Sequence, residues 1–291
     1  MVEYWKRGFF STPALQHSNT PFGVFKGLKM KILVAGDLVG SPGRTMFARV
    51  AGKMKAAGEV DFVVANAENA AGGRGITPAL VEELLQAGAD VLTLGDHVWD
   101  QKEIVGYFDR EPRLLRGANL ASGCPGKGWV TLDTPKGAVT VVSLIGRVFM
   151  PPNDCPFHAI DRFLSSVERK GRVIVVDMHA EATSEKIAMG RYLDGRVSAV
   201  LGTHTHVQTA DEAMLPKGTA YLTDLGMTGP KDSVLGRDVT SVLHKFLTGM
   251  PSQFKVATED VRFEGALLDV DEQTGKARRI QRLQISFGAE R

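Results

Sequence analysis

Residues 31–37 have the sequence KILVAGD, an apolar run that ends in a glycine and an acidic residue. Residues 32–35 have the length and composition of a buried strand. Similar apolar runs recur along the chain, with helix-like stretches between them; they cover residues 62–65, 91–94, 139–145, 173–176, 197–201 and 220–222. Strands that alternate with helices in this way predict an α/β domain.

Local signals predict where two helices begin. Ser41 followed by Pro42 is typical of an N-cap and a first-turn proline, and Thr77 followed by Pro78 repeats the signal. Apolar residues at helical spacing follow both pairs, as expected for helices that pack on a sheet.

The C-terminal part of the chain has a different pattern. Residues 265–271 and 280–287 resemble strands, and a turn at residues 271–275 joins them. We expect an antiparallel hairpin that finishes a second sheet.

Composition limits the classes of protein that fit. Of the 291 residues, 35 are Lys or Arg and 33 are Asp or Glu, so the net charge of +2 gives no general field for binding polyanions. Any recognition of phosphate must be local.

Two cysteines, Cys124 and Cys155, are too few for a disulfide framework, which favours reduced thiols and a cytoplasmic location. No apolar run approaches the roughly 20 residues of a membrane-spanning helix, so we expect a soluble protein with no membrane partner.

The N-terminal segment, residues 1–29, differs from the rest of the chain. It has four basic residues against one acidic residue, and its aromatic and polar residues show no period. Met30 stands directly before the first predicted strand. We interpret residues 1–29 as a peripheral extension, either disordered or the product of an upstream start codon, with a basic transit peptide as the lesser alternative. Residues 30–291 then form the one predicted domain.

Polar side chains with metal-ligand chemistry follow five of the predicted strands. They are Asp37; Glu68 and Asn69; Asp96 and His97; Asp177 and His179; and His204 and His206. Open α/β sheets place their sites at the carboxyl ends of their strands, so we expect these groups to converge. A single Asp at a strand end is more often a turn former, but two imidazoles two residues apart share one side of an extended segment. The set as a whole predicts a metal site.

Several motifs around these residues form a recognisable pattern. They are GDLVGSPGR at residues 36–44, NAENAAGG at 66–73, DMHAEATSEK at 177–186, the segment 202–211, and TDLGMTGP at 223–230. Together they resemble the YmdB-like branch of the calcineurin-type metallophosphoesterases, over nearly everything from Met30 to the C-terminus. The resemblance implies a four-layer α/β/β/α sandwich, with two mixed sheets flanked by helices.

The resemblance also implies two transition-metal ions that share one carboxylate. One ion would be bound by Asp37, Glu68, Asn69 and His206, and the other by Glu68, Asp96, His179 and His204. Relatives point to iron or manganese, with zinc as an alternative, and the ligand types do not choose among them. Two such ions can hold a bridging hydroxide and neutralise charge as it attacks phosphorus. His97 matches the family's proton donor to the leaving oxygen.

The implied activity is hydrolysis of 2′,3′-cyclic nucleotides to nucleoside 3′-phosphates. The substrate would be a small nucleotide or an RNA end that carries a 2′,3′-cyclic phosphate. Two alternatives stay open: a broader phosphodiesterase or phosphatase that acts on nucleotides or RNA ends, and a regulatory binding protein that retains the metal fold. His97 favours an enzyme, because a binding module needs no proton donor. The sequence is compatible with a homo-oligomer.

Two positions depart from the wider superfamily. Asp96 stands where the superfamily pattern Gly-Asn-His has Asn. The added negative charge should tighten divalent-metal binding and make the bridging water less acidic. Val39 stands where the superfamily has a His, and the YmdB-like pattern covers that gap with Asn69.

Two arginines are further candidates for substrate binding. Arg44 lies early in the first predicted helix, where it either aids phosphate binding or is a solvated helix cation. Arg147 follows the apolar run at residues 139–145, and loops at strand ends often carry sites.

Overall fold

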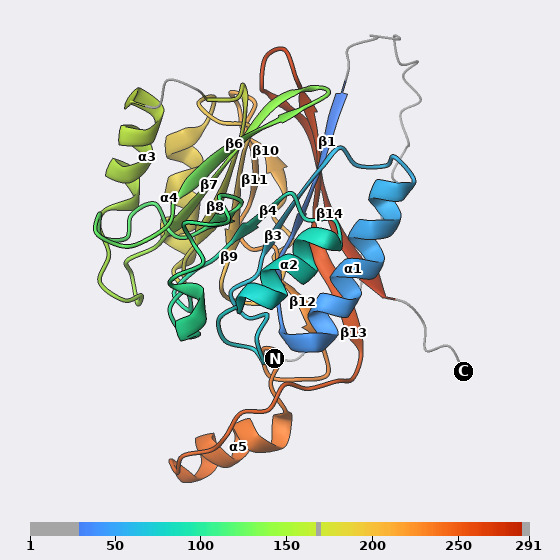
Figure 1. Cartoon of the computed structure of the whole chain (residues 1–291), viewed down its shortest axis with the longest axis vertical. Coiled ribbons are helices and arrows are strands. Elements are labelled where there is room, and N and C mark those ends of the chain that lie inside the picture. The colour runs from blue at the N-terminus through green and yellow to red at the C-terminus, as the bar shows by residue number, and fades with distance from the viewer. Residues whose placement is uncertain (1–28, 167–169, 287–291) are drawn as a thin grey trace, which may run out of the picture.

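The structure is a computed structural model that describes residues 29–166 and 170–286 (Figure 1). The predicted peripheral segment lies outside the described residues, except for Lys29, with which the first strand begins. The helices are α1 (Gly40–Ala56), α2 (Pro78–Gln86), α3 (Pro156–Ser166), α4 (Thr183–Leu193) and α5 (Val239–Thr248), with a short 3-10 helix, η1, at Lys102–Ile104. Among the described residues, no helix is long and apolar enough to cross a membrane.

The strands form two sheets. In the first sheet the order is β2-β12-β13-β1-β3-β4-β5, and β14 also pairs with β13. Its strands are β1 (Lys29–Ala35), β2 (Asp37–Leu38), β3 (Phe62–Asn66), β4 (Val91–Thr93), β5 (Leu114–Leu115), β12 (Met227–Pro230), β13 (Val261–Asp271) and β14 (Ala277–Ser286). The second sheet has the order β10-β11-β9-β8-β7-β6. Its strands are β6 (Trp129–Thr134), β7 (Gly137–Ile145), β8 (Val173–His179), β9 (Ala199–Thr203), β10 (Ala213–Met214) and β11 (Ala220–Leu222).

Both sheets are mixed, as predicted. In the first, β1 is parallel to β3 but antiparallel to β13. In the second, β7 is parallel to β8 but antiparallel to β6. The parallel strands at the centre of each sheet end at the same edge, which is what brings their terminal residues together.

Three buried apolar clusters separate four layers. One cluster packs α1 and α2 on the first sheet, the second fills the space between the two sheets, and the third packs α3 and α4 on the second sheet. The alternation along β1 explains this division: Ile32 and Val34 face the second sheet, whereas Leu33 and Ala35 face the helices. The predicted α/β/β/α sandwich is confirmed (Figure 1).

The C-terminal hairpin forms, but the prediction that it finishes a second sheet is wrong. β13 pairs antiparallel with β1, with Ala35 opposite Gly265, so the hairpin extends the sheet that the first strand begins. A Cβ at Gly265 would lie 2.3 Å from the Val34 carbonyl oxygen, so this close pairing requires glycine. The hairpin could be predicted from local sequence pattern. The sheet that it joins could not, because that depends on pairing with β1 near the other end of the chain.

The two predicted helix starts have different outcomes. Thr77 is the N-cap residue of α2 and Pro78 is its first residue, as predicted. The prediction of Ser41 as an N-cap is wrong, because α1 begins at Gly40 with Val39 before it. The Val39 carbonyl already accepts the N–H of Gly43, so the helical hydrogen bonds start two residues earlier than the Ser-Pro signal indicated.

Residues 231–260, between β12 and β13, form an arm that carries α5 away from the sheets (Figure 1). Asp238 caps the helix by accepting a hydrogen bond from the Ser241 N–H at 2.9 Å, and Gly249 ends it in the left-handed conformation. Within α5 only Val242 is buried, while Phe246 is 81% exposed. The arm therefore presents apolar and charged side chains beyond the sandwich.

Candidate metal centre

The strand ends bring the predicted ligand types together at one edge of the sandwich. In the first sheet Asp37 lies in β2, directly after β1, and Glu68 and Asp96 follow β3 and β4; in the second sheet His179 ends β8 and His204 follows β9. Ligand atoms of Glu68, Asp96, His179 and His204 all lie within 4.8 Å of one another. We call these four residues the inner group.

Distances within the inner group are those of ligands around a shared centre. His179 Nε2 lies 3.2 Å from Glu68 Oε1 and 3.1 Å from Asp96 Oδ1. His204 Nδ1 lies 3.0 Å from His179 Nε2 and 3.3 Å from Asp96 Oδ1. A Cβ at Gly95 would lie 2.1 Å from the His179 ring, so glycine is required beside Asp96 for the two sheets to approach this closely.

Three further predicted ligands lie beside the inner group, and we call them the outer group: Asp37, Asn69 and His206. His206 Nε2 lies 3.1 Å from Asn69 Oδ1 and 4.0 Å from Asp37 Oδ1. Asp37 and Asn69 are buried. Asp37 Oδ1 has no hydrogen-bond partner among the described residues, although it is fully enclosed. A buried carboxylate oxygen without a donor is explained if a cation binds there.

The loop after β9 aims two imidazoles at the site through an unusual backbone. His204 has φ 99° and His206 has φ 63°, both in the region that favours glycine. Asp224 holds the residue between them, because its Oδ2 accepts hydrogen bonds from the Thr205 N–H at 3.2 Å and hydroxyl at 2.8 Å. The same oxygen pairs with the buried ammonium of Lys186 at 2.6 Å. This ion pair fixes the strained loop.

A second buried carboxylate positions His179. Thr203 Oγ1 lies 2.9 Å from His179 Nδ1 and donates to Asp177 Oδ1 at 2.6 Å. Asp177 Oδ2 accepts from Thr93 Oγ1 at 2.5 Å and from Asn66 Nδ2 at 3.1 Å, so residues of both sheets surround it. The network holds Nδ1 of His179 and leaves Nε2 facing the inner group. Metal-binding histidines are commonly oriented in this way through their other nitrogen.

The pKa values of the buried carboxylates and imidazoles indicate that the site favours a bound cation. Burial raises the pKa of Asp37 well above its ordinary value, and Glu68 adds to the effect. Burial lowers the pKa of His179, but the carboxylates of Glu68 and Asp96 outweigh it and raise that pKa well above the ordinary value. Burial lowers the pKa of His206 to about 4, so its imidazole is neutral and free to bind a cation at neutral pH. Oxygen and imidazole donors without a thiolate fit iron, manganese or zinc.

His97 lies at the mouth of the site, with a fixed ring. Its backbone N–H donates to Glu68 Oε2 at 3.2 Å, and its Nδ1 lies 2.9 Å from Asp100 Oδ2. Asp100 also pairs with Arg74 at 2.9 Å. Nδ1 is held by the Asp100 carboxylate, and Nε2 of His97 has no hydrogen-bond partner among the described residues.

The two arginine candidates are not brought to this site. The Arg44 guanidinium lies 2.9 Å from Glu83 Oε1 and donates to the Ala70 carbonyl at 2.7 Å, so it joins α1 to α2 and to the loop after β3. Arg147 is exposed, and its backbone N–H donates to the Glu185 carboxylate at 3.0 Å. Neither residue lines the cavity beside the ligand groups.

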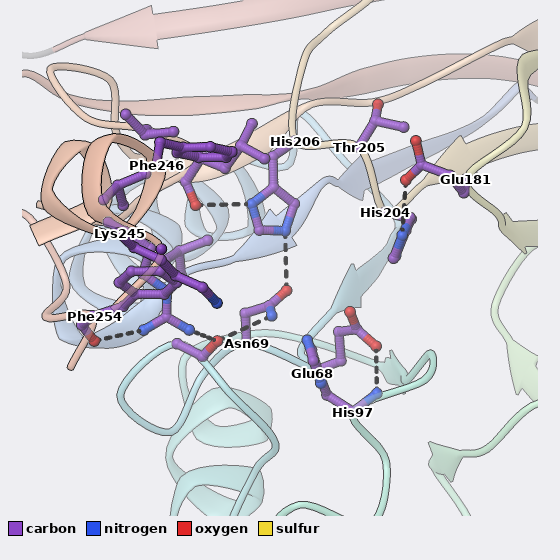
Figure 2. Close-up of a pocket in the computed structure, with 17 residues that line it drawn as sticks. Glu68, Asn69, His97, Glu181, His204, Thr205, His206, Lys245, Phe246 and Phe254 are labelled. Atoms are coloured by element: carbon purple, nitrogen blue, oxygen red, sulfur yellow. Dashed lines mark hydrogen bonds and ion pairs between the residues drawn. The ribbon is translucent and has the colours of Figure 1, made fainter. Parts of the chain in front are cut away.

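A cavity of about 680 Å³ opens between the ligand groups and the arm (Figure 2). Its ligand side includes Glu68, Asn69, His97, His204 and His206. Its arm side includes Leu235, Arg237, Val242, Lys245, Phe246 and Phe254. The volume falls within the roughly 300–1,000 Å³ that is typical of small-ligand pockets.

A ring of hydrogen bonds joins the arm to the outer group. Arg237 Nη2 and Asn69 Nδ2 donate to the same carbonyl oxygen, that of Gly73, at 2.5 and 3.1 Å. Asn69 Oδ1 lies 3.1 Å from His206 Nε2, and His206 Nδ1 lies 3.2 Å from the Leu235 carbonyl oxygen. Because Leu235 and Arg237 belong to the arm, its base helps to hold two of the predicted ligands.

Several residues that the structure places at the site had no individual role predicted from the sequence. Asp177 was expected to converge with the ligand residues, and its spacing of two from His179 was a signal that it lies beside that imidazole. Glu181, whose Oε2 lies 3.1 Å from His204 Nε2, had a weaker one in the same motif. Lys245 and Phe254 had none, because no local pattern indicates that the arm folds toward the ligand groups.

The fold and the ligand groups agree with the resemblance to metallophosphoesterases. The sequence model of the YmdB-like proteins matches residues 33–283. The chain therefore belongs to the YmdB-like family.

Three relatives are similar over most of their length. The 2′,3′-cyclic-nucleotide 2′-phosphodiesterase of Bacillus subtilis is 47% identical over 257 residues, which are 88% of this chain and 97% of that protein. A solved structure of a hypothetical protein from Thermus thermophilus is 41% identical with a TM-score of 0.83, covering 88% of this chain and 99% of that one. A solved Mycoplasma pneumoniae protein described as a novel phosphatase is 32% identical with a TM-score of 0.83, covering 89% and 94%.

Proposed function

We propose that this protein is a metal-dependent phosphodiesterase that hydrolyses 2′,3′-cyclic nucleotides to nucleoside 3′-phosphates. The observation that carries the proposal is the inner group, whose four ligand atoms lie within 4.8 Å of one another and whose Glu68 and His204 line a cavity large enough for a nucleotide. A relative with 47% identity is named for this activity, which supports the choice of substrate class.

We propose that the inner and outer groups hold two transition-metal ions and share Glu68. Asp37, Glu68, Asn69 and His206 would hold one ion, and Glu68, Asp96, His179 and His204 the other. Iron or manganese fits these donors, with zinc as the alternative. When bound, the ions would activate a water molecule as the nucleophile and neutralise charge on the phosphate oxygens. Asp96, a carboxylate where the superfamily pattern has Asn, would tighten the binding of its ion.

The protein's own groups supply the remaining chemistry. His97 would donate a proton from Nε2 to the leaving O2′, with Asp100 fixing the ring through Nδ1. His179 is held through Nδ1 by Thr203 and Asp177 and therefore does not have to reorganise during the reaction. Arg44 and Arg147 remain proposals as substrate contacts; the contacts of Arg44 with Glu83 and Ala70 favour a structural role for it.

The second candidate is a broader phosphodiesterase or phosphatase that acts on nucleotides or RNA ends through the same centre. A relative described as a phosphatase favours keeping it. A regulatory binding protein is less well supported, because the fixed ring of His97 has a use in catalysis and none in binding alone.

The setting of the activity is part of the proposal. Cys124 and Cys155 are free thiols, which supports action in the reducing cytoplasm. The exposed apolar side chains of α5, such as Phe246 and Leu247, are compatible with a homo-oligomer.

Product analysis tests the proposed function directly. The protein, purified with added Mn²⁺, is expected to convert 2′,3′-cAMP to 3′-AMP, and Glu68→Gln is expected to remove this turnover. The matched control is Lys255→Gln, which changes an exposed residue of the arm. Release of 2′-AMP would contradict the assignment of the broken ester. Hydrolysis of nucleoside monophosphates without action on 2′,3′-cAMP would favour the phosphatase alternative.

A further inference from the structure

Lys245 lines the arm side of the cavity, opposite the ligand groups. Its ammonium lies 5.2 Å from the centre of the Phe254 ring, within the range of a cation–π contact. In Figure 2 the side chain extends from α5 into the space that Asn69 and Glu68 border. Among the described residues, no carboxylate lies within salt-bridge distance of it.

Of the cavity's lining residues, Lys245 and Arg237 carry positive side chains. Arg237 is already engaged, because its guanidinium donates to the carbonyl oxygens of Gly72, Gly73 and Phe254. Lys245 is therefore the cation at the arm side that is left for a ligand. Its charge lies outside the inner and outer groups, so it does not serve to balance their carboxylates.

Backbone hydrogen bonds hold the helix that carries Lys245, and the exposed side chain contacts the Phe254 ring without losing its charge. Asp238 caps the start of α5, and the Lys245 carbonyl accepts the N–H of Gly249 at the end of the helix. Arg237 donates to the Phe254 carbonyl at 3.4 Å, which ties the segment that carries the ring to the base of the arm. An anion that binds here meets an ammonium that the Phe254 ring favours at this side of the cavity.

The geometry of a ribonucleotide connects the two sides of the cavity. The 2′ and 3′ oxygens lie on one face of the ribose ring, and the base and the 5′ carbon lie on the other face. If the cyclic phosphate lies at the ligand groups, the 5′ substituent extends away from them. In this cavity the opposite side is the arm.

We propose that Lys245, supported by Phe254, is a subsite for a phosphate on the 5′ oxygen of the reacting nucleotide. The proposal rests on the proposed function and deepens it: the preferred substrates are 2′,3′-cyclic nucleotides that also carry a 5′ phosphate. This group occurs as a 5′-phosphomonoester in a mononucleotide and as the preceding phosphodiester at the 3′ end of an RNA chain. The same charge recognises both.

Binding of products tests the subsite without turnover. Metal-loaded protein is titrated calorimetrically with adenosine 3′-monophosphate and with adenosine 3′,5′-bisphosphate. The wild type is expected to bind the bisphosphate about 10–100-fold more tightly, as one charge-assisted contact provides. Lys245→Gln should remove most of this preference, Lys245→Arg should retain it, and the exposed control Lys255→Gln should leave it unchanged. If Lys245 only stabilised α5, its replacement would not alter the ratio between the affinities for the bisphosphate and the monophosphate.

Turnover separates the two sources of the phosphate. Adenosine 2′,3′-cyclic phosphate is compared with its 5′-phosphorylated form and with a dinucleotide that ends in the cyclic phosphate. Lys245→Gln should raise KM about tenfold or more for one or both 5′-substituted substrates, with little change in kcat or in KM for the unsubstituted one. An effect confined to the mononucleotide would assign the subsite to phosphomonoesters, and an effect on the dinucleotide would assign it to RNA ends.

The failure of this proposal differs from the failure of the proposed function. Absence of turnover on all three cyclic substrates would refute the activity, whereas the product affinities would still report on the subsite. Equal affinity of the wild type for both products, or an undiminished preference in Lys245→Gln, would overturn the subsite even if every cyclic substrate were hydrolysed.

Discussion

The hydroxyl of Thr93 donates a hydrogen bond to the carboxylate of Asp177 at 2.5 Å, across the space between the two sheets. Thr93 belongs to β4 and Asp177 to β8, and both are buried. The contact ties the strand before Asp96 to the strand that ends in His179. The two sheets are thus joined by this buried hydrogen bond as well as by the contact between His179 and Asp96.

Thr93→Val should destabilise the protein because the buried Asp177 carboxylate loses one of its donors. The free energy of unfolding is expected to fall by about 1–3 kcal/mol, the cost of leaving a buried polar group unsatisfied. Urea unfolding measures the change. Thr258→Val, at an exposed position, is the control. An effect no larger than that of the control would mean that the contact does not stabilise the junction.

Metal content distinguishes the shared ligand from an unshared one. The wild type, produced with added Mn²⁺, is expected to carry close to two ions per chain by elemental analysis. Glu68→Gln should lose both, since both groups use this carboxylate, whereas His206→Ala should chiefly lose one. His158→Ala, in α3, should resemble the wild type. A metal-free wild type would refute the dinuclear assignment.

His97→Ala should lower kcat on a 2′,3′-cyclic nucleotide by roughly 10²–10⁴ through loss of the proton donor. The fall should be much smaller on a p-nitrophenyl phosphodiester, whose leaving group needs little protonation. Metal content should stay at the wild-type level. Equal losses on both substrates, or recovery with excess metal, would instead make His97 a residue that orients Asp96.

Asp37→Asn should stabilise the metal-free protein. Burial raises the pKa of Asp37, so its charge costs folding energy increasingly as pH rises above about 3.9, its unfolded value. At neutral pH the metal-free variant should melt a few degrees above the metal-free wild type, and the difference should shrink as pH falls. With Mn²⁺ the order should reverse, because only the wild type binds fully. Asp232→Asn is the exposed control. A lower melting temperature in both states would contradict this reasoning.

A chain that begins at Met30 should fold and turn over like the full chain. Every proposed ligand lies between Asp37 and His206, and the family match begins at residue 33. Thermal melting and kcat/KM for 2′,3′-cAMP measure the comparison. A loss of many degrees or of activity would place residues 1–29 in the core or the site.

The sequence predicted the parts of the fold that depend on local pattern. The runs that became β1, β3, β8 and β9 are each followed by ligand chemistry, because a strand's period and its terminal residues lie within a few positions of one another. The short strands β2 and β12 had no such signal; they form because Met227 pairs with Asp37 and Thr228 with Leu38, across a long separation in sequence.

The site was predictable to a similar extent. Ligands at strand ends converge in any sheet of this kind, so their grouping followed from topology. The residues that support them did not, because Lys186, Asp224 and Arg237 act through tertiary contacts with no fixed spacing. Arg44 shows the same limit: its position early in a helix suggested either phosphate binding or a solvated cation, whereas its contact with Glu83 depends on how α1 packs against α2.

The pairing of β1 with β13 has a consequence for the order of events during synthesis. By the time His206 has left the ribosome, every proposed ligand has been made, yet β1 still lacks its antiparallel neighbour. The backbone of Asp37 is anchored by the Gly226 carbonyl, and Gly36 by that of Glu264, both of which emerge later. A nascent chain can therefore contain every proposed ligand residue and still lack the backbone contacts that position them. We therefore expect metal to bind in the native arrangement only after the C-terminal hairpin has been translated.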